Sequence, residues 1–144
     1  MNEESSPIEK LYEWQEWPVV VIRAAAYEIS DEQFSEAMHN FGDEIKKRQG
    51  LYAMVIDTIG SHKLPPSQRR ILTDYLKQEE ELTKKFCAGQ AMVMKSSVVR
   101  GIMTAVFWMY KPPYETKVFT NIDEAIACGH KMVEARARAE GKDA

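Results

Sequence analysis

The chain has 144 residues and a mass of 16.5 kDa, a length that predicts one domain rather than two. Hydrophobic residues make up 44% and charged residues 28%, a balance that is typical of a globular domain and excludes a disordered or fibrous chain. The net charge of -3 argues against a generally basic nucleic-acid binder, so no nucleic-acid partner is expected.

The compartment is predicted from the N-terminal residues and the cysteines. Residues 1–10 are acidic, lack the apolar run of a secretory leader and are expected to be flexible. Cys87 and Cys128 have neither CxxC nor Cys/His spacing, so no disulfide framework, metal or cofactor is indicated. The longest apolar stretch, Val98–Tyr110, is interrupted by Arg100 and is too short to span a membrane. These features favour a cytoplasmic protein.

The first predicted elements are a hairpin and an amphipathic helix. Residues 11–25 contain two β-rich runs joined by a turn that ends in a proline. Ser30 and Gln33 have capping-box spacing, which predicts a helix that continues through Gln49 and is terminated by Gly50. Its apolar stripe comprises Phe34, Met38, Phe41 and Ile45.

The middle of the chain predicts two buried strands, each followed by a helix. Residues 51–57 and 88–94 are short apolar runs, and the first is expected to be central in a sheet. Between them, prolines open one long helix of about 20 residues. Ser96 or Ser97 caps the next helix, which covers residues 98–109.

The last elements are a short strand at residues 116–119 and a helix capped by Thr120 or Asn121. Inward-facing positions on that helix are Ile122, Ala125, Ile126, Met132 and Val133. Residues 136–144 are expected to be a solvated helix end or a frayed tail.

The element order is therefore β-β-α-β-α-β-α-β-α. Strands that alternate with helices favour right-handed crossovers and a mostly parallel sheet, and the opening hairpin supplies an antiparallel edge. We predict a single α/β domain over residues 11–135, a two-layer or three-layer sandwich with a mostly parallel five-stranded sheet.

Several segments resemble bacterial STAS-like proteins, relatives of the anti-sigma-factor antagonists that are often grouped with lipid-transfer domains. They are the strand ending at Asp57, the helix opening at residues 64–70, the stretch 96–108 and the closing segment 117–126. The likeness covers roughly Trp17–Val133. It implies a STAS-like sandwich and a non-catalytic switch, in which a partner kinase phosphorylates a serine at a helix start.

Ser67 is the nearest equivalent of that serine by position. The family's Asp-Ser-Ser-Gly type of turn is absent here, and a longer loop, Thr58–Pro66, takes its place. At the position matching Cys128 the family commonly has an aromatic residue. No catalytic residue can be carried over from the family.

Basic residues are concentrated in the middle of the chain, where residues 58–119 contain ten Lys and Arg against five acids. In a parallel sheet, the helices that follow the two central strands begin at the same edge, so their positive dipole ends lie near one another. The candidate residues for an anion or phosphorylation site there are Ser67, Arg69, Arg70, Ser96, Ser97, Arg100 and Asp57. The alternative is that the serines are caps and the arginines form a solvated face.

Arg100 interrupts an apolar helix, and a charge in such a place needs a carboxylate or a ligand. Asp57, at the end of a central strand, is the expected partner. His39, His62 and His130 have no spacing suited to one metal, which leaves an Asp57–His62 pair as the catalytic alternative. No catalytic motif supports an enzyme.

The helix over Val98–Tyr110 is more apolar than a one-sided helix requires, so we predict burial of most of its circumference. Two alternatives are a surface for a partner or a second copy, and the wall of a pocket for an acyl chain. The residues concerned are Ile102, Met103, Val106, Phe107, Trp108 and Met109.

The leading functional prediction is a non-catalytic cytoplasmic regulatory module that binds a partner protein, with phosphorylation or an anionic ligand as its candidate switch. The alternative is a small-ligand or lipid-binding domain whose cavity the Val98–Tyr110 helix lines. A homodimer is left open, and no cofactor is expected.

Overall fold

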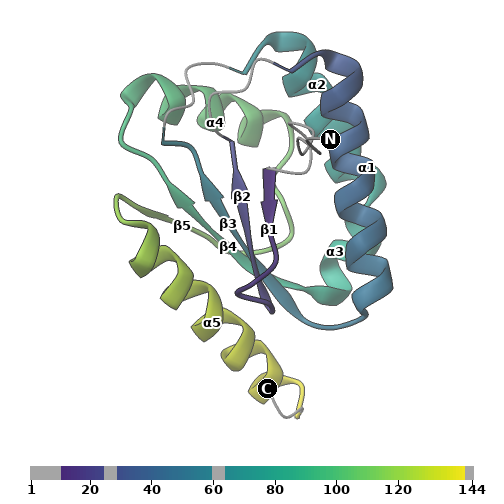
Figure 1. The fold of residues 1–144 in the computed structure, drawn as a ribbon, viewed down its shortest axis with the longest axis vertical. Helices are drawn as coiled ribbons and strands as arrows, with labels where there is room; N and C mark the ends of the chain where they lie inside the picture. The colour runs from purple at the N-terminus through teal and green to yellow at the C-terminus, as the bar shows by residue number, and fades with distance from the viewer. Residues whose placement is uncertain (1–10, 25–28, 60–63, 142–144) are drawn as a thin grey trace, which may run out of the picture.

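A computed structural model describes residues 11–24, 29–59 and 64–141, which form an α/β domain around one five-stranded sheet (Figure 1). The strands lie in sequence order: β1 (Tyr12–Glu13), β2 (Val19–Arg23), β3 (Tyr52–Asp57), β4 (Cys87–Val93) and β5 (Thr116–Phe119). β1 pairs with β2 antiparallel and the other pairs are parallel, which confirms the predicted hairpin and the mostly parallel sheet. The segment predicted to be flexible, 1–10, lies outside the described residues.

The helices are divided unequally between the two faces of the sheet. They are α1 (Asp31–Arg48), α2 (Pro66–Gln78), α3 (Glu80–Phe86), α4 (Ser97–Met109) and α5 (Ile122–Ala139). Because each parallel strand is added on the same side of the preceding one, right-handed crossovers bring their connecting helices to the same face. α5 follows the last strand and covers the opposite face (Figure 1). The sandwich therefore has three layers.

The alternation of side chains along the strands separates the core in two. Val19, Val21, Val55 and Val93 point toward α5 and pack around Ala125. On the other face, two clusters pack against the crossover helices. One contains Val20, Phe41, Ile45, Tyr52, Met54 and Cys87, and the other contains Met92, Met94 and Val99.

Side-chain caps begin three of the helices, as predicted from sequence spacing. The Ser30 side chain accepts from the Gln33 amide while the Gln33 side chain accepts from the Ser30 amide. Asn121 rather than Thr120 caps α5, and Ser96 rather than Ser97 caps α4. These bonds satisfy amides that the first helical turn leaves free.

The end of α1 differs from the prediction. The residue in the left-handed conformation is Gln49, with φ 48°, and not Gly50. The Gln49 amide still bonds to the Ile45 carbonyl, so the helix closes normally before the chain enters β3.

The single long helix predicted before β4 is wrong, because it is broken at Glu79 into α2 and α3. α2 packs along α1, whereas α3 brings Leu82 and Phe86 into the cluster on the sheet. One straight helix could not satisfy both contacts. No glycine or proline marks the break, and the apolar period continues through it. The sequence pattern therefore predicts one helix.

The predicted burial of the apolar helix is also wrong. In α4 only Val99 and Val106 are buried, while Trp108 is 85% exposed and Val98 is 64% exposed. Within the described part of the chain, no helix combines the length and hydropathy needed to cross a membrane.

The buried thiol of Cys87 and the buried phenols of Tyr52 and Tyr114 lead us to expect a loss of stability at alkaline pH. Burial raises the pKa of the Cys87 thiol to about 12, and burial also raises the pKa values of Tyr52 and Tyr114. In the unfolded chain these groups ionise near their ordinary values, about 8.5 for cysteine and about 10 for tyrosine. Their contribution is therefore fully present below about pH 8.5 and declines as the pH rises toward the folded-state values.

We expect the urea midpoint to be unchanged up to about pH 8 and to fall progressively above about pH 9. Cys87→Ala should reduce the slope of this fall, since it removes one of the ionising groups. A midpoint that is constant to about pH 10 would contradict the expectation.

Candidate functional site

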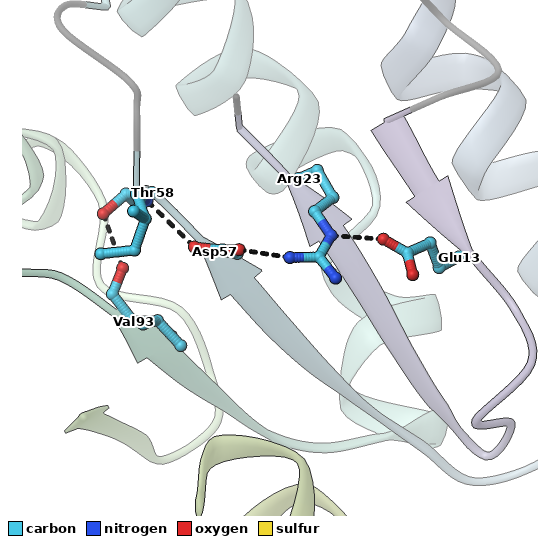
Figure 2. A network of polar contacts seen from close by, with 6 residues as sticks. Glu13, Arg23, Asp57, Thr58 and Val93 are labelled. Carbon is cyan, nitrogen blue, oxygen red and sulfur yellow. Dashed lines mark hydrogen bonds and ion pairs between the residues drawn. The ribbon is translucent and has the colours of Figure 1, made fainter. Parts of the chain in front are cut away.

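The candidate site lies at the carboxyl edge of the parallel strands. β2 and β3 both end in Val-Ile followed by a charged residue, Arg23 in one and Asp57 in the other. Because the two strands are parallel and in register at this point, Arg23 stands directly beside Asp57. Arg23 also contacts Glu13 of β1, so three strands are joined by one chain of charges (Figure 2).

Both carboxylate oxygens of Asp57 are occupied by donors. The Arg23 guanidinium donates to Oδ2 at 2.6 Å, and the Ile59 amide donates to Oδ1 at 3.0 Å. Asp57 is buried, whereas the Arg23 side chain is about one-third exposed. Asp57 is thus a structural anchor of the edge in this arrangement.

The predicted pair of Asp57 and Arg100 is wrong. The ion-pair partner of Asp57 is Arg23, and Arg100 lies exposed on α4. Sequence reasoning placed Arg100 inside a buried helix, and this premise fails because that side of α4 faces solvent. An exposed guanidinium needs no carboxylate partner, since water solvates it.

The next residue, Thr58, connects β3 to β4. Its hydroxyl donates to the Val93 carbonyl at 2.6 Å, and its amide donates to the same oxygen at 3.0 Å (Figure 2). Thr58 is buried, so these bonds satisfy polar groups that have no access to water.

Ser67 joins the beginnings of two helices. Its hydroxyl donates to Asp31 at the start of α1, at 3.1 Å, and the Gln68 side chain donates to the Ile29 carbonyl at 2.9 Å. Gln68 is buried and Ser67 is exposed. We call these two bonds the Ser67–Gln68 clasp, because they hold the segment before α1 against the first turn of α2.

The remaining candidate residues occupy different surroundings. Arg69 turns back on its own helix start, where its Nε donates to the Leu64 carbonyl at 2.8 Å. The Ser96 hydroxyl is used in capping α4. Arg70, Ser97 and Arg100 are exposed.

The apolar candidates on α4 divide between core and surface. Val106 is buried, and Met103 and Phe107 pack against the cluster of Met92, Met94 and Val99. Ile102 is half-buried, whereas Trp108 and Met109 are exposed.

The histidines are distributed over the molecule. His39 bonds within α1 to the Ser35 carbonyl, and His130 of α5 lies 3.3 Å from Glu16. His62 lies outside the described residues, as does the proposed pair with Asp57. Among the residues with described positions, no group of His, Cys, Asp and Glu could hold a metal ion.

A shallow groove of about 430 Å³ lies near the end of α1, away from the carboxyl edge. Its lining combines two lysines, one glutamine and two apolar side chains: Lys46, Lys85, Gln49, Leu82 and Phe86. Lys46 is already within 3.5 Å of Glu79. None of the α4 residues proposed as a pocket wall lines this groove.

Sequence reasoning missed Glu13, Arg23, Thr58 and Asp31. A signal for one pair was present, since the endings Val-Ile-Arg23 and Val-Ile-Asp57 place opposite charges at the same step of two adjacent strands. No comparable signal marks Asp31, which is 36 residues from Ser67 and meets it only because α1 and α2 pack together.

Comparison with known proteins does not identify a family. No protein-family model matches the sequence, and no curated protein matches it at a significant level. The STAS-like resemblance therefore stays a prediction.

Proposed function

We propose that this chain is a non-catalytic, cytoplasmic regulatory module of STAS-like type that acts by binding another protein at the carboxyl edge of its sheet. The Ser67–Gln68 clasp is the observation that carries the proposal. It puts an exposed hydroxyl at a helix start, in contact with a carboxylate of a second helix. A change of charge at Ser67 would therefore alter the contact between the starts of α1 and α2.

The occupancy of the edge supports binding rather than catalysis. A general base needs a lone pair within reach of a substrate proton. Asp57 accepts hydrogen bonds from Arg23 and from the Ile59 amide, and its side chain is only 10% exposed, so a substrate has little access to it. The exposed Arg70, Ser97 and Arg100 instead offer donors to a partner.

Phosphorylation of Ser67 would have two opposing electrostatic effects. The first turn of α2 favours a negative group by about 0.3–1 kcal/mol. Against this, the phosphate would lose the hydrogen bond to Asp31 and meet its negative charge, each effect amounting to about 1 kcal/mol. The two destabilising effects together exceed the stabilisation by the helix start. We therefore propose that modification opens the clasp and presents a changed surface to the partner.

The test compares affinity capture from host lysate by the wild type and by Ser67→Glu. We expect at least one protein to bind the two forms with at least about fivefold different recovery, the ratio that corresponds to about 1 kcal/mol. Asp31→Asn in the Ser67→Glu background should restore the contact between the helices, and with it the wild-type recovery. Lys131→Gln, an exposed change on α5, serves as the matched control.

The same set and amount of captured proteins with all four forms would refute the switch. Circular dichroism and thermal unfolding of each variant show whether a changed recovery reflects the clasp or a loss of fold. An anionic small molecule as the switch is tested separately by thermal shift with phosphate esters and nucleotides, repeated with Arg100→Ala.

A further inference from the structure

The outer side of α4 carries an apolar stripe that the described part of the domain covers only in part. Val98, Ile102, Ala105 and Met109 follow one another at helical spacings of four, three and four residues, so they share one face. Trp108 adjoins this stripe. Exposure is 64% at Val98, 50% at Met109 and 85% at Trp108.

A second line of residues on the same helix accounts for its packing in the domain. Val99, Met103 and Val106 lie one position further along. Val99 and Met103 pack with Met92 of β4 and with Met94, which follows it, and Val106 is fully buried. The core therefore does not require the exposed stripe, and large side chains such as Trp108 are an unfavourable choice for a surface that only meets water.

The charged residues within the α4 segment have one sign, and Glu80 of α3 lies against Tyr110 at the end of this segment. Residues 95–113 contain Lys95, Arg100 and Lys111 and no acidic residue, in a chain whose net charge is -3. Lys95 precedes α4 and Lys111 follows it, so positive charge lies at both ends of the stripe. Arg100 is two residues after Val98, about 200° around the helix, and lies on the other side of the exposed face. Such positive charge is complementary to a negatively charged partner.

From this arrangement we infer that α4 docks the domain on the surface of a membrane that contains anionic phospholipid. An amphipathic helix with exposed Trp and aliphatic residues and flanking cationic residues lies in the plane of the interface, with its apolar face between the lipid headgroups. α4 has 13 residues and is about 20 Å long, so it lies on the bilayer and does not cross it. Tryptophan favours the headgroup level, which suits Trp108 at the end of the helix.

A second copy of the chain fits this face less well. A twofold contact sets the same patch of each copy against the other, so the cationic residues flanking the two α4 helices would repel each other. An acidic protein has suitable charge, but a convex helix with a single protruding Trp108 offers it no groove, whereas fluid headgroups adapt to any shape.

The experiment is co-sedimentation of the full chain with vesicles of phosphatidylcholine alone and of an equimolar mixture of phosphatidylcholine and phosphatidylglycerol. We expect binding to the mixture, weaker binding to phosphatidylcholine and a decrease with added salt. Trp108→Gln should weaken binding by about tenfold and Lys111→Gln by about fivefold. Lys131→Gln on the opposite face should bind as the wild type does.

Fluorescence locates the contact on α4. Trp108→Phe keeps an apolar side chain but removes the indole, so the wild-type spectrum minus the variant spectrum isolates Trp108 from Trp14 and Trp17. That difference spectrum should shift to shorter wavelength when mixed vesicles are added. Since Trp108 and Lys111 are exposed, circular dichroism should show that both variants keep the fold.

Three results would each overturn the inference. The first is that the folded wild type stays in the supernatant with mixed vesicles, which leaves α4 to an acidic protein. The second is equal vesicle binding by the wild type and Trp108→Gln. The third is that the wild type does not bind vesicles and forms a dimer in analytical ultracentrifugation that Trp108→Gln dissociates. That result would assign the face to a second copy. None of them bears on the Ser67 switch.

Discussion

Replacing Gly129 with leucine should lower the free energy of unfolding by about 3 kcal/mol, because α5 packs on the sheet through this position. A Cβ atom at Gly129 would lie 3.0 and 3.1 Å from the two γ-carbons of Val19 and 3.7 Å from the Cβ of Ala53. Val19 is fully buried and branched at Cβ, so it has little freedom to move aside. A leucine side chain fits only if α5 moves away from β2 and β3.

The unfolding midpoint in urea measures this effect, and two variants bracket it. Gly129→Ala adds one carbon and should cost about 1 kcal/mol, since Val19 needs to yield by only a few tenths of an ångström. Ala127→Leu adds the same side chain at an exposed position of α5 and should leave the midpoint nearly unchanged. Equal midpoints for Gly129→Leu and Ala127→Leu would show that α5 does not pack closely at Gly129.

Replacing Arg23 with methionine should lower the free energy of unfolding by about 2 kcal/mol, because it leaves the buried Asp57 carboxylate without its positive partner. The loss stays below the about 3–5 kcal/mol of a fully buried pair, since the Arg23 side chain is 37% exposed and water screens the interaction. Asp57 would retain the bond from the Ile59 amide.

A double-mutant cycle separates the ion pair from packing. Asp57→Asn in the Arg23→Met background should recover part of the lost stability, since a neutral amide costs less to bury than an unpaired carboxylate. Glu13→Gln, at the outer end of the network and about one-third exposed, should cost less than about 1 kcal/mol. Additive effects of the Arg23 and Asp57 substitutions would mean that the two side chains do not interact in solution.

Features set by neighbours in the sequence were predicted well. The capping box of Ser30 and Gln33 forms between residues three apart, so its spacing alone specifies it. The same spacing left Thr120 and Asn121 as alternatives for the last helix, and Asn121 is the cap. The strand at residues 116–119 was predicted with the bounds that β5 has. The opening hairpin and the parallel strands that follow also came from local pattern, together with the handedness of crossovers.

The candidate site was predicted only at the level of its edge. Asp57 was assigned to the end of a central strand, but its partner was taken to be Arg100 and is Arg23. That choice depends on the register of β2 against β3, which brings together residues 34 apart. Ser67 was selected by topology, while its contact with Asp31 exists only because two helices pack.

The sequence by itself determined the order of elements, the α/β class and most helix starts, because these depend on the period of apolar residues and on caps within one turn. The tertiary structure decided the break at Glu79, the pairing of Arg23 with Asp57 and the exposure of one side of α4. Each of these depends on which surfaces meet across the fold. The spacing of apolar residues along a helix is the same in the sequence whether or not a neighbouring element covers them.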